Sequence, residues 1–129
     1  MENGFIVLHR KIIKWEWYTD NNVFKLFLHL LLRANHEDKY WRGILVKRGQ
    51  LITSIKHLSD ETGLSIKQVR TALDKLKSTG EVVSKGQSRY TLVTIEKYSD
   101  YQDKKEKEGE QTANKRTNKG QTKGNKQQW

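Results

Sequence analysis

The chain has 129 residues, of which 25 are Lys or Arg and 15 are Asp or Glu, so its formal charge at neutral pH is +10. It contains no cysteine, which excludes disulfides and thiolate metal or redox sites. Its longest apolar-rich stretch, residues 23–32, is too short to span a membrane, and the N-terminus shows no secretory signal. We therefore expect a soluble cytoplasmic protein whose basic excess serves either an anionic partner or solubility alone.

The polar excess is concentrated in residues 103–129, where the only apolar side chains are Ala113 and Trp129. This segment has eight basic and four acidic side chains, and it repeats short Asn-Lys and Gly-Gln-Thr phrases. It buries too little apolar surface to offset chain entropy, so we predict a disordered low-complexity tail and one folded domain over residues 1–102. The tail is interpreted as a tether or as a non-specific nucleic-acid arm, and the wide spacing of its basic residues favours the tether.

Two helices are predicted in the N-terminal third of the chain. An apolar stripe with spacings of three and four residues runs from Phe5 to Trp15 and is typical of one helical face. The N-cap signal at residues 20–22 opens a second helix over about 23–34, which is apolar on nearly every side. Such a helix needs cover on most sides. We interpret it either as the central helix of the core or as part of a homo-oligomer interface.

The middle of the chain predicts a helix-turn-helix. Residues 35–42 are expected to form a polar loop, and residues 44–53 to form two short extended runs around Gly49. A third helix then ends at Gly63. Because Ser65 and Gln68 form an S-x-x-Q capping box, a fourth helix is expected to begin only two residues later. A short helix, a tight turn and a capped second helix are the parts of a helix-turn-helix.

The helix after Ser65 has one apolar side and one side of basic and hydrogen-bonding residues. The apolar stripe comprises Val69, Ala72, Leu73 and Leu76; the opposite face carries Lys67, Gln68, Thr71 and Lys75, with Arg70 and Lys77 on its flank. Lys and Arg bond guanine edges and phosphates, Gln bonds adenine, and the Thr methyl contacts thymine. The alternative is an ordinary solvated surface with an Arg70–Asp74 ion pair. The position of the helix within the motif favours DNA recognition.

Two extended runs, residues 81–84 and 90–96, follow the glycine that ends this helix, Gly80. The loop between them has a cation at each end, Lys85 and Arg89, and we expect both to contact phosphate or a minor groove. A helix-turn-helix followed by a β-hairpin is the order of a winged helix, with residues 50–53 as the third strand. The predicted fold class is therefore mainly α with a small β-sheet (α+β): a winged helix-turn-helix with extra N-terminal helices.

Catalytic signatures are absent from the sequence. The histidines His9, His29, His36 and His57 have no metal-ligand spacing, and neither a phosphate-binding loop nor a nucleophile elbow is present. We expect no enzyme activity, metal or cofactor. The aromatic residues Trp15, Trp17, Tyr18 and Trp41 are interpreted as core or interface residues rather than as platforms for stacked bases.

Several motifs together are more specific than a bare helix-turn-helix. They are Trp15-Glu-Trp-Tyr, Phe24-Lys-Leu-Phe-Leu-His-Leu-Leu, Lys47-Arg-Gly-Gln-Leu-Ile-Thr-Ser, the run Thr62-Gly-Leu-Ser-Ile-Lys-Gln-Val-Arg-Thr-Ala-Leu continuing to Glu81, and Thr91-Leu-Val-Thr-Ile. Over roughly residues 4–101 the sequence resembles the N-terminal winged-helix domain of the DnaD-like phage replication initiators, the replisome organisers of bacteriophages and prophages of Gram-positive bacteria.

The resemblance implies binding to double-stranded DNA at a replication origin and self-association through the N-terminal helices. It also implies help in helicase loading, through a loader protein and a second, helical domain that has no counterpart in residues 103–129. Two other functions for the same fold remain open: a transcription regulator, and a protein–protein module in replisome assembly.

Overall fold

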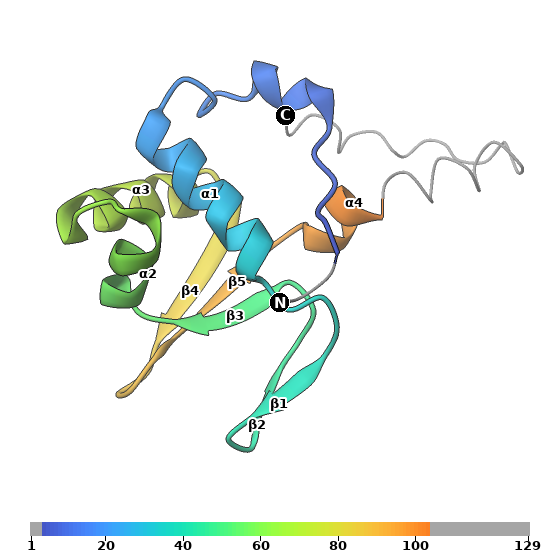
Figure 1. Ribbon diagram of the computed structural model, residues 1–129, viewed down its shortest axis with the longest axis vertical. Helices are drawn as coiled ribbons and strands as arrows, with labels where there is room; N and C mark the ends of the chain where they lie inside the picture. Colours follow the sequence, from blue (N-terminus) through green and yellow to red (C-terminus); the bar gives the residue numbers. More distant parts are fainter. Residues whose placement is uncertain (1–3, 104–129) are drawn as a thin grey trace, which may run out of the picture.

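The structure, a computed structural model, describes residues 4–103. Its elements are the 3-10 helix η1 (Arg10–Lys14), α1 (Asn21–Arg33), β1 (Lys39–Trp41), β2 (Ile44–Val46), β3 (Gln50–Thr53), α2 (Ile55–Thr62), α3 (Ile66–Ser78), β4 (Val82–Gly86), β5 (Thr91–Ile95) and α4 (Tyr98–Gln102). They form an α+β fold with two small antiparallel sheets, β1–β2 and β3–β5–β4. In Figure 1, α1, α2 and α3 lie together on one side of the three-stranded sheet, and the β1–β2 hairpin projects away from the body. No helix in the described part of the chain is long and apolar enough to cross a membrane.

Helix α1 is the centre of the hydrophobic core, and its prediction is confirmed. Its N-cap is Asp20, whose carboxylate accepts a hydrogen bond from the Val23 N–H at 3.2 Å. Five side chains of α1 are buried in the core, together with the apolar stripe of α3. They are Val23, Leu26, Phe27, Leu30 and Leu31. Burying one such side chain contributes about 1.5–3 kcal/mol. One chain thus covers most of α1, although Leu32 remains 59% exposed.

The helix predicted from Phe5 to Trp15 is wrong apart from one turn. Only η1 is helical, and residues 4–9 form neither helix nor strand. Phe5 is 85% exposed and Leu8 is 42% exposed, whereas Trp15 is buried. The apolar spacing in this segment therefore does not mark one continuous buried helical face.

The reason lies in a partner far along the chain. The Gln102 side chain accepts from the Val7 N–H at 2.7 Å and donates to the Val7 carbonyl at 3.2 Å. Both backbone groups of Val7 are thus satisfied by α4 instead of by helical neighbours. Backbone groups need a partner when they are removed from water, and this partner lies 95 residues away in sequence.

The end of the predicted loop over residues 35–42 is also wrong, because β1 pairs there with β2. The strands are joined by Arg42 and Gly43, which have φ angles of 49° and 81°. Positive φ at both central residues is typical of the tight hairpin turn whose twist matches the flanking strands. Gly43 between two β-forming runs was the signal in the sequence for this hairpin.

The two helices predicted around Gly63 are confirmed. α2 ends at Gly63, whose φ is 84°, and α3 has its N-cap at Ser65. In the predicted capping box, the Gln68 N–H donates to Ser65 Oγ at 3.1 Å and the Ser65 N–H donates to Gln68 Oε1 at 2.9 Å. The start of α3 is thus fixed by local hydrogen bonds.

The three-stranded sheet has β5 at its centre, with β3 and β4 on either side. The predicted strand over residues 50–53 is confirmed as β3, and it pairs antiparallel with β5. β4 continues to Gly86, two residues beyond the predicted end. The tip of the β4–β5 hairpin is therefore residues 87–90, closed by a 2.7 Å hydrogen bond from the Gln87 N–H to the Tyr90 carbonyl.

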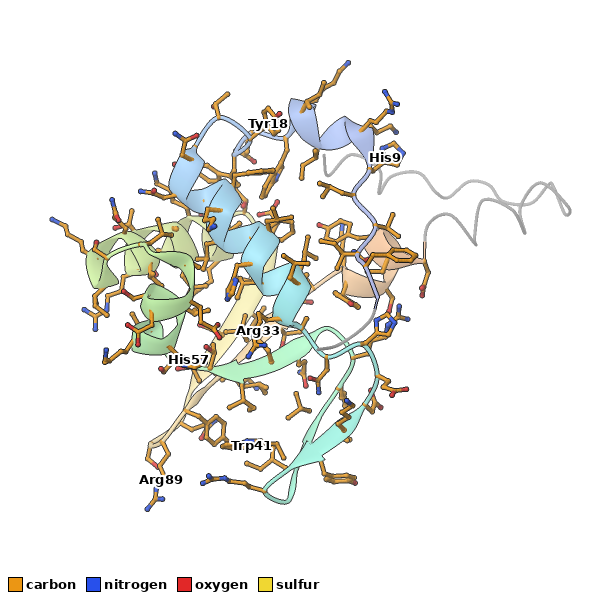
Figure 2. The ribbon with its side chains drawn as sticks, in the orientation of Figure 1. His9, Tyr18, Arg33, Trp41, His57 and Arg89 are labelled. Atoms are coloured by element: carbon orange, nitrogen blue, oxygen red, sulfur yellow. The ribbon has the colours of Figure 1, made fainter. Side chains whose placement is uncertain are left out.

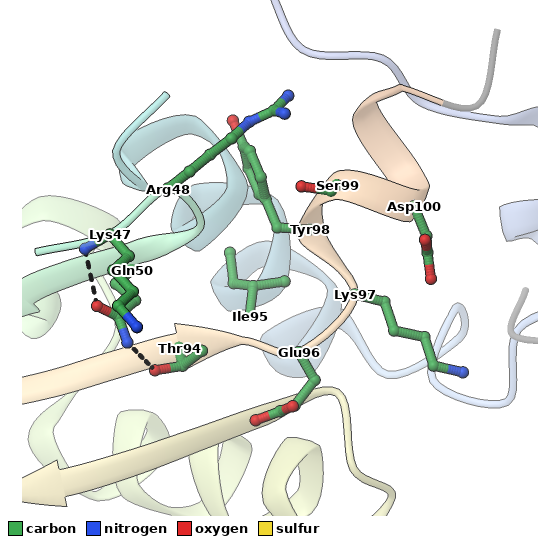
Figure 3. A pocket seen from close by; sticks show the side chains of 10 residues that line it. All are labelled: Lys47, Arg48, Gln50, Thr94, Ile95, Glu96, Lys97, Tyr98, Ser99 and Asp100. Atoms are coloured by element: carbon green, nitrogen blue, oxygen red, sulfur yellow. Dashed lines mark hydrogen bonds between the residues drawn. The ribbon is translucent and has the colours of Figure 1, made fainter. Parts of the chain in front are cut away.

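Helix α4 was not predicted. It buries Tyr98 and Tyr101, and burial raises the pKa of both phenols. Figure 3 shows the Arg48 side chain next to the Tyr98 ring, with its guanidinium 5.4 Å from the ring centroid, beside a pocket of about 220 Å³. Arg48 also donates two hydrogen bonds of 2.9 Å to the carboxylate of Asp103. The predicted domain boundary after residue 102 stays a prediction. The disordered tail was predicted for residues 103–129, of which all but Asp103 lie outside the described residues.

Candidate nucleic-acid interface

The polar face of α3 is largely open to solvent. Lys67, Gln68, Arg70 and Thr71, in the N-terminal half of the helix, are all exposed. The apolar stripe on the other side is buried as predicted. A helix with this division can be fastened to a core through one side while it presents donors and acceptors on the other.

Gln68 has only part of its hydrogen-bonding capacity available. Its Oε1 atom accepts from the Ser65 N–H in the capping box. Its side-chain NH₂ group is not used in the capping box. The bidentate recognition of adenine uses both the oxygen and the nitrogen of the amide. To make it, Gln68 Oε1 would have to accept a second hydrogen bond beside the capping bond, or give the capping bond up.

Lys75 lies on the predicted face but turns toward the body of the protein. Its Nζ is 2.8 Å from Asp20 Oδ2 and 5.7 Å from the centroid of the Trp17 ring. The hydrogen bond from Lys75 lowers the pKa of the Asp20 carboxyl below its ordinary value of 3.8; burial opposes this shift, and the Val23 N–H adds to it. Lys75 therefore ties the second half of α3 to the start of α1.

The ion pair on the flank of α3 is not the Arg70–Asp74 pair that the alternative interpretation predicted. Asp74, which that alternative paired with Arg70, lies 3.9 Å from Lys77 in the structure. Both Asp74 and Lys77 are exposed at the surface, where such a pair contributes little to stability. Arg70 and Lys77 are both exposed, and their contact with DNA stays a prediction.

A second set of contacts fastens the C-terminal end of α3 to the N-terminal segment. Trp15 Nε1 donates to Glu81 Oε2 at 2.9 Å, and Trp17 Nε1 donates to Thr79 Oγ1 at 2.9 Å. The Thr79 hydroxyl donates in turn to Glu81 Oε1. Glu81 is only 9% exposed, so its carboxylate needs these donors. The interpretation of Trp15 as a core residue is confirmed.

The two hairpin cations lie on the β4–β5 hairpin. Lys85 stands opposite Leu92 in the register of β4 and β5, and Arg89 lies at the tip; both are exposed. Figure 2 shows Arg89 pointing away from the body at the far end of this hairpin. In Figure 1 the tip and the α2–α3 pair lie toward the same edge of the view.

The structure adds aromatic and basic residues that the sequence analysis did not place beside this hairpin. The Trp41 ring on β1 packs edge to face against Tyr90, with 5.2 Å between the centroids, and the Arg42 guanidinium lies 5.1 Å from the Trp41 centroid. Trp41 therefore lies on a strand rather than in a loop, and it joins the two hairpins. In the sequence, the β-forming residues around Gly43 were the signal for a strand at Trp41.

Two histidines and an arginine surround one carboxylate between α1 and α2. Glu61 lies 2.8 Å from His29 Nε2, 3.2 Å from His57 Nε2 and 3.6 Å from an Arg33 nitrogen. Burial raises the pKa of Glu61, but the hydrogen bond to His29 and the nearby positive charges outweigh it and lower the pKa overall. Within residues 4–103, no group of three or more His, Asp or Glu side chains is placed to hold a metal ion.

Comparisons with models of known protein families, with curated proteins and with solved structures find no match. The resemblance to phage replication initiators therefore stays a prediction from the sequence motifs. A function has to be argued from the residues and their geometry.

Proposed function

We propose that residues 4–103 form a winged-helix domain that binds double-stranded DNA sequence-specifically at a replication origin, as the N-terminal domain of a phage-type replication initiator. The order of elements supports the winged helix: α2, a tight turn and α3 precede the β4–β5 hairpin, and β3 completes the sheet. The observation that carries the proposal is the exposed polar face of α3 above a buried apolar stripe.

In this proposal the N-terminal half of α3 enters the major groove. Lys67 and Thr71 contact base edges, and Gln68 contributes its free amide group. Arg70 and Lys77 hold phosphates at the flank, and Lys85 and Arg89 hold phosphates on the hairpin. Because Lys75 is bound to Asp20, we assign it the role of fixing the angle of α3 rather than of reading a base.

Self-association and helicase loading enter the proposal only through the family resemblance. The N-terminal segment carries the exposed apolar side chains Phe5, Leu8 and Ile13, which suit a contact with a second copy. Contact with a helicase loader is proposed for a part of the protein outside residues 4–103.

The test is a fluorescence anisotropy titration of the full chain against duplexes tiled across its own coding region. Lys67→Ala should weaken binding to the best duplex by about tenfold and reduce the preference for it. Lys85→Ala should weaken binding to all duplexes alike. With these four phosphate contacts, affinity should fall on the order of a hundredfold between 50 and 200 mM salt.

The matched control is Lys14→Ala, which removes the same charge from η1 and should change affinity less than twofold, since Lys14 is exposed and lies on neither α3 nor the β4–β5 hairpin. Equal affinity of Lys67→Ala and Lys14→Ala, or a flat salt response, would refute the proposal. Footprinting on the bound duplex separates the two DNA functions, because an initiator protects an origin and a transcription regulator protects a promoter.

A further inference from the structure

A groove of about 410 Å³ runs between the β1–β2 hairpin and the ends of α1 and α2. Lys39, Tyr40 and Trp41 line it from the hairpin, and Arg33 and His57 line it from the helices. Strand β3 contributes apolar side chains between them. Figure 2 shows His57 near the end of β3 and Arg33 beside that strand, with Trp41 across from them on the hairpin side. None of these residues belongs to the polar face of α3.

The groove combines aromatic rings with positive charge. Tyr40 is 74% exposed, so most of its side chain is open to solvent. Lys39 and Arg33 supply two cations. The carboxylate that lines the groove, Glu61, is already bound by His29, His57 and Arg33.

This surface continues onto the β4–β5 hairpin. Trp41 contacts Tyr90, Arg42 lies over the Trp41 ring, and Arg89 precedes Tyr90 in the chain. Two aromatic rings and two arginine residues therefore lie between the hairpin tip and the mouth of the groove. Aromatic rings together with cations suit the bases and phosphates of a nucleic-acid strand.

We propose that this groove binds an unpaired nucleotide of single-stranded DNA. The base stacks against the exposed ring of Tyr40, and the flanking phosphates lie on Lys39, Arg33 and Arg42. The volume suits one nucleotide, whereas a duplex keeps its bases paired and stacked and presents no ring face to such a groove. The inference goes beyond duplex recognition, since it uses residues outside α3.

The test measures anisotropy of a fluorescent oligo-dT 15-mer and of a duplex of equal length, both titrated with the full chain. Tyr40→Ala should weaken oligo-dT binding by about tenfold, because stacking on one ring is lost. Tyr40→Phe keeps the ring and should bind as the wild type does. Arg33→Gln should weaken oligo-dT binding and reduce its salt dependence, and circular dichroism verifies the fold of each variant.

The two proposals fail separately. Lys67→Ala should weaken duplex binding and leave oligo-dT binding unchanged, while Tyr40→Ala should do the reverse. The groove proposal is overturned if the wild type does not bind oligo-dT, or if Tyr40→Ala and Arg33→Gln both bind it as tightly as the control Lys14→Ala. Loss of oligo-dT binding in Lys67→Ala with no loss in Tyr40→Ala would place single strands on α3 and also overturn it.

Discussion

Replacing Gly49 by alanine tests how α4 is held against the sheet. Gly49 has a φ of +85°, and a Cβ atom there would lie 2.7 Å from Tyr98 Cβ and 3.1 Å from Tyr98 Cγ. The left-handed backbone costs a residue with a Cβ about 1–2 kcal/mol. Overpacking against a buried ring that cannot easily move adds about 1–3 kcal/mol. We expect Gly49→Ala to lower the free energy of unfolding by roughly 2–5 kcal/mol in all.

Gly43→Ala separates the two contributions. Gly43 has a similar φ of +81°, but a Cβ there would meet no atom within 4 Å. It should therefore cost only the backbone strain, about 1–2 kcal/mol. Urea unfolding followed by tryptophan fluorescence measures both variants. If they lose equal stability, Tyr98 does not close on Gly49 and the docking of α4 described above is incorrect.

Two further predictions concern the contacts that fasten α3. Asp20→Asn retains a good N-cap but loses the charge pair with Lys75. The pKa of Asp20 is lowered in the folded state. The pair therefore stabilises the fold fully above pH 3.8, the ordinary pKa of Asp, and this stabilisation is lost as the pH falls through the lowered pKa. The stability difference between wild type and Asp20→Asn, from urea unfolding between pH 7 and 2, should therefore vanish in acid; a constant difference would contradict this. Glu81→Gln removes the negative charge that accepts from Trp15 and Thr79 and replaces one acceptor oxygen by an NH₂ donor; it should cost about 1–3 kcal/mol in thermal unfolding. The exposed control Glu96→Gln should change stability by less than about 0.5 kcal/mol, and equal losses would contradict the role of Glu81.

Elements fixed by local signals could be predicted from the sequence. The Ser65–Gln68 capping box fixes where α3 begins, and a sharp apolar stripe fixes which side of the helix is buried. Both signals lie in the helix or at its first residue. α1 likewise carries its own N-cap and apolar faces. Such signals need no knowledge of the rest of the chain.

Elements fixed by distant partners could not be predicted. The spacing from Phe5 to Trp15 fits a helix, but Gln102 takes the backbone of Val7 from 95 residues away. The engagement of Lys75 depends in the same way on Asp20, 55 residues earlier. Periodicity reports which side chains share a face, and it does not report which partner that face will meet.

The contacts of α3 divide it into two parts with different roles. Its C-terminal end is fastened by Lys75 to Asp20, and the following residues Thr79 and Glu81 bind two tryptophans, while the polar side of its first turns faces solvent. Lys67 lies eight residues before Lys75, about 12 Å along the axis at 1.5 Å per residue. A tilt of about 10° at the anchored end would therefore move Lys67 by about 2 Å, which is enough to break a hydrogen bond. In the proposed function, the Trp15-Glu-Trp-Tyr motif thus serves recognition without touching DNA, because it sets the angle at which the exposed half of α3 is presented.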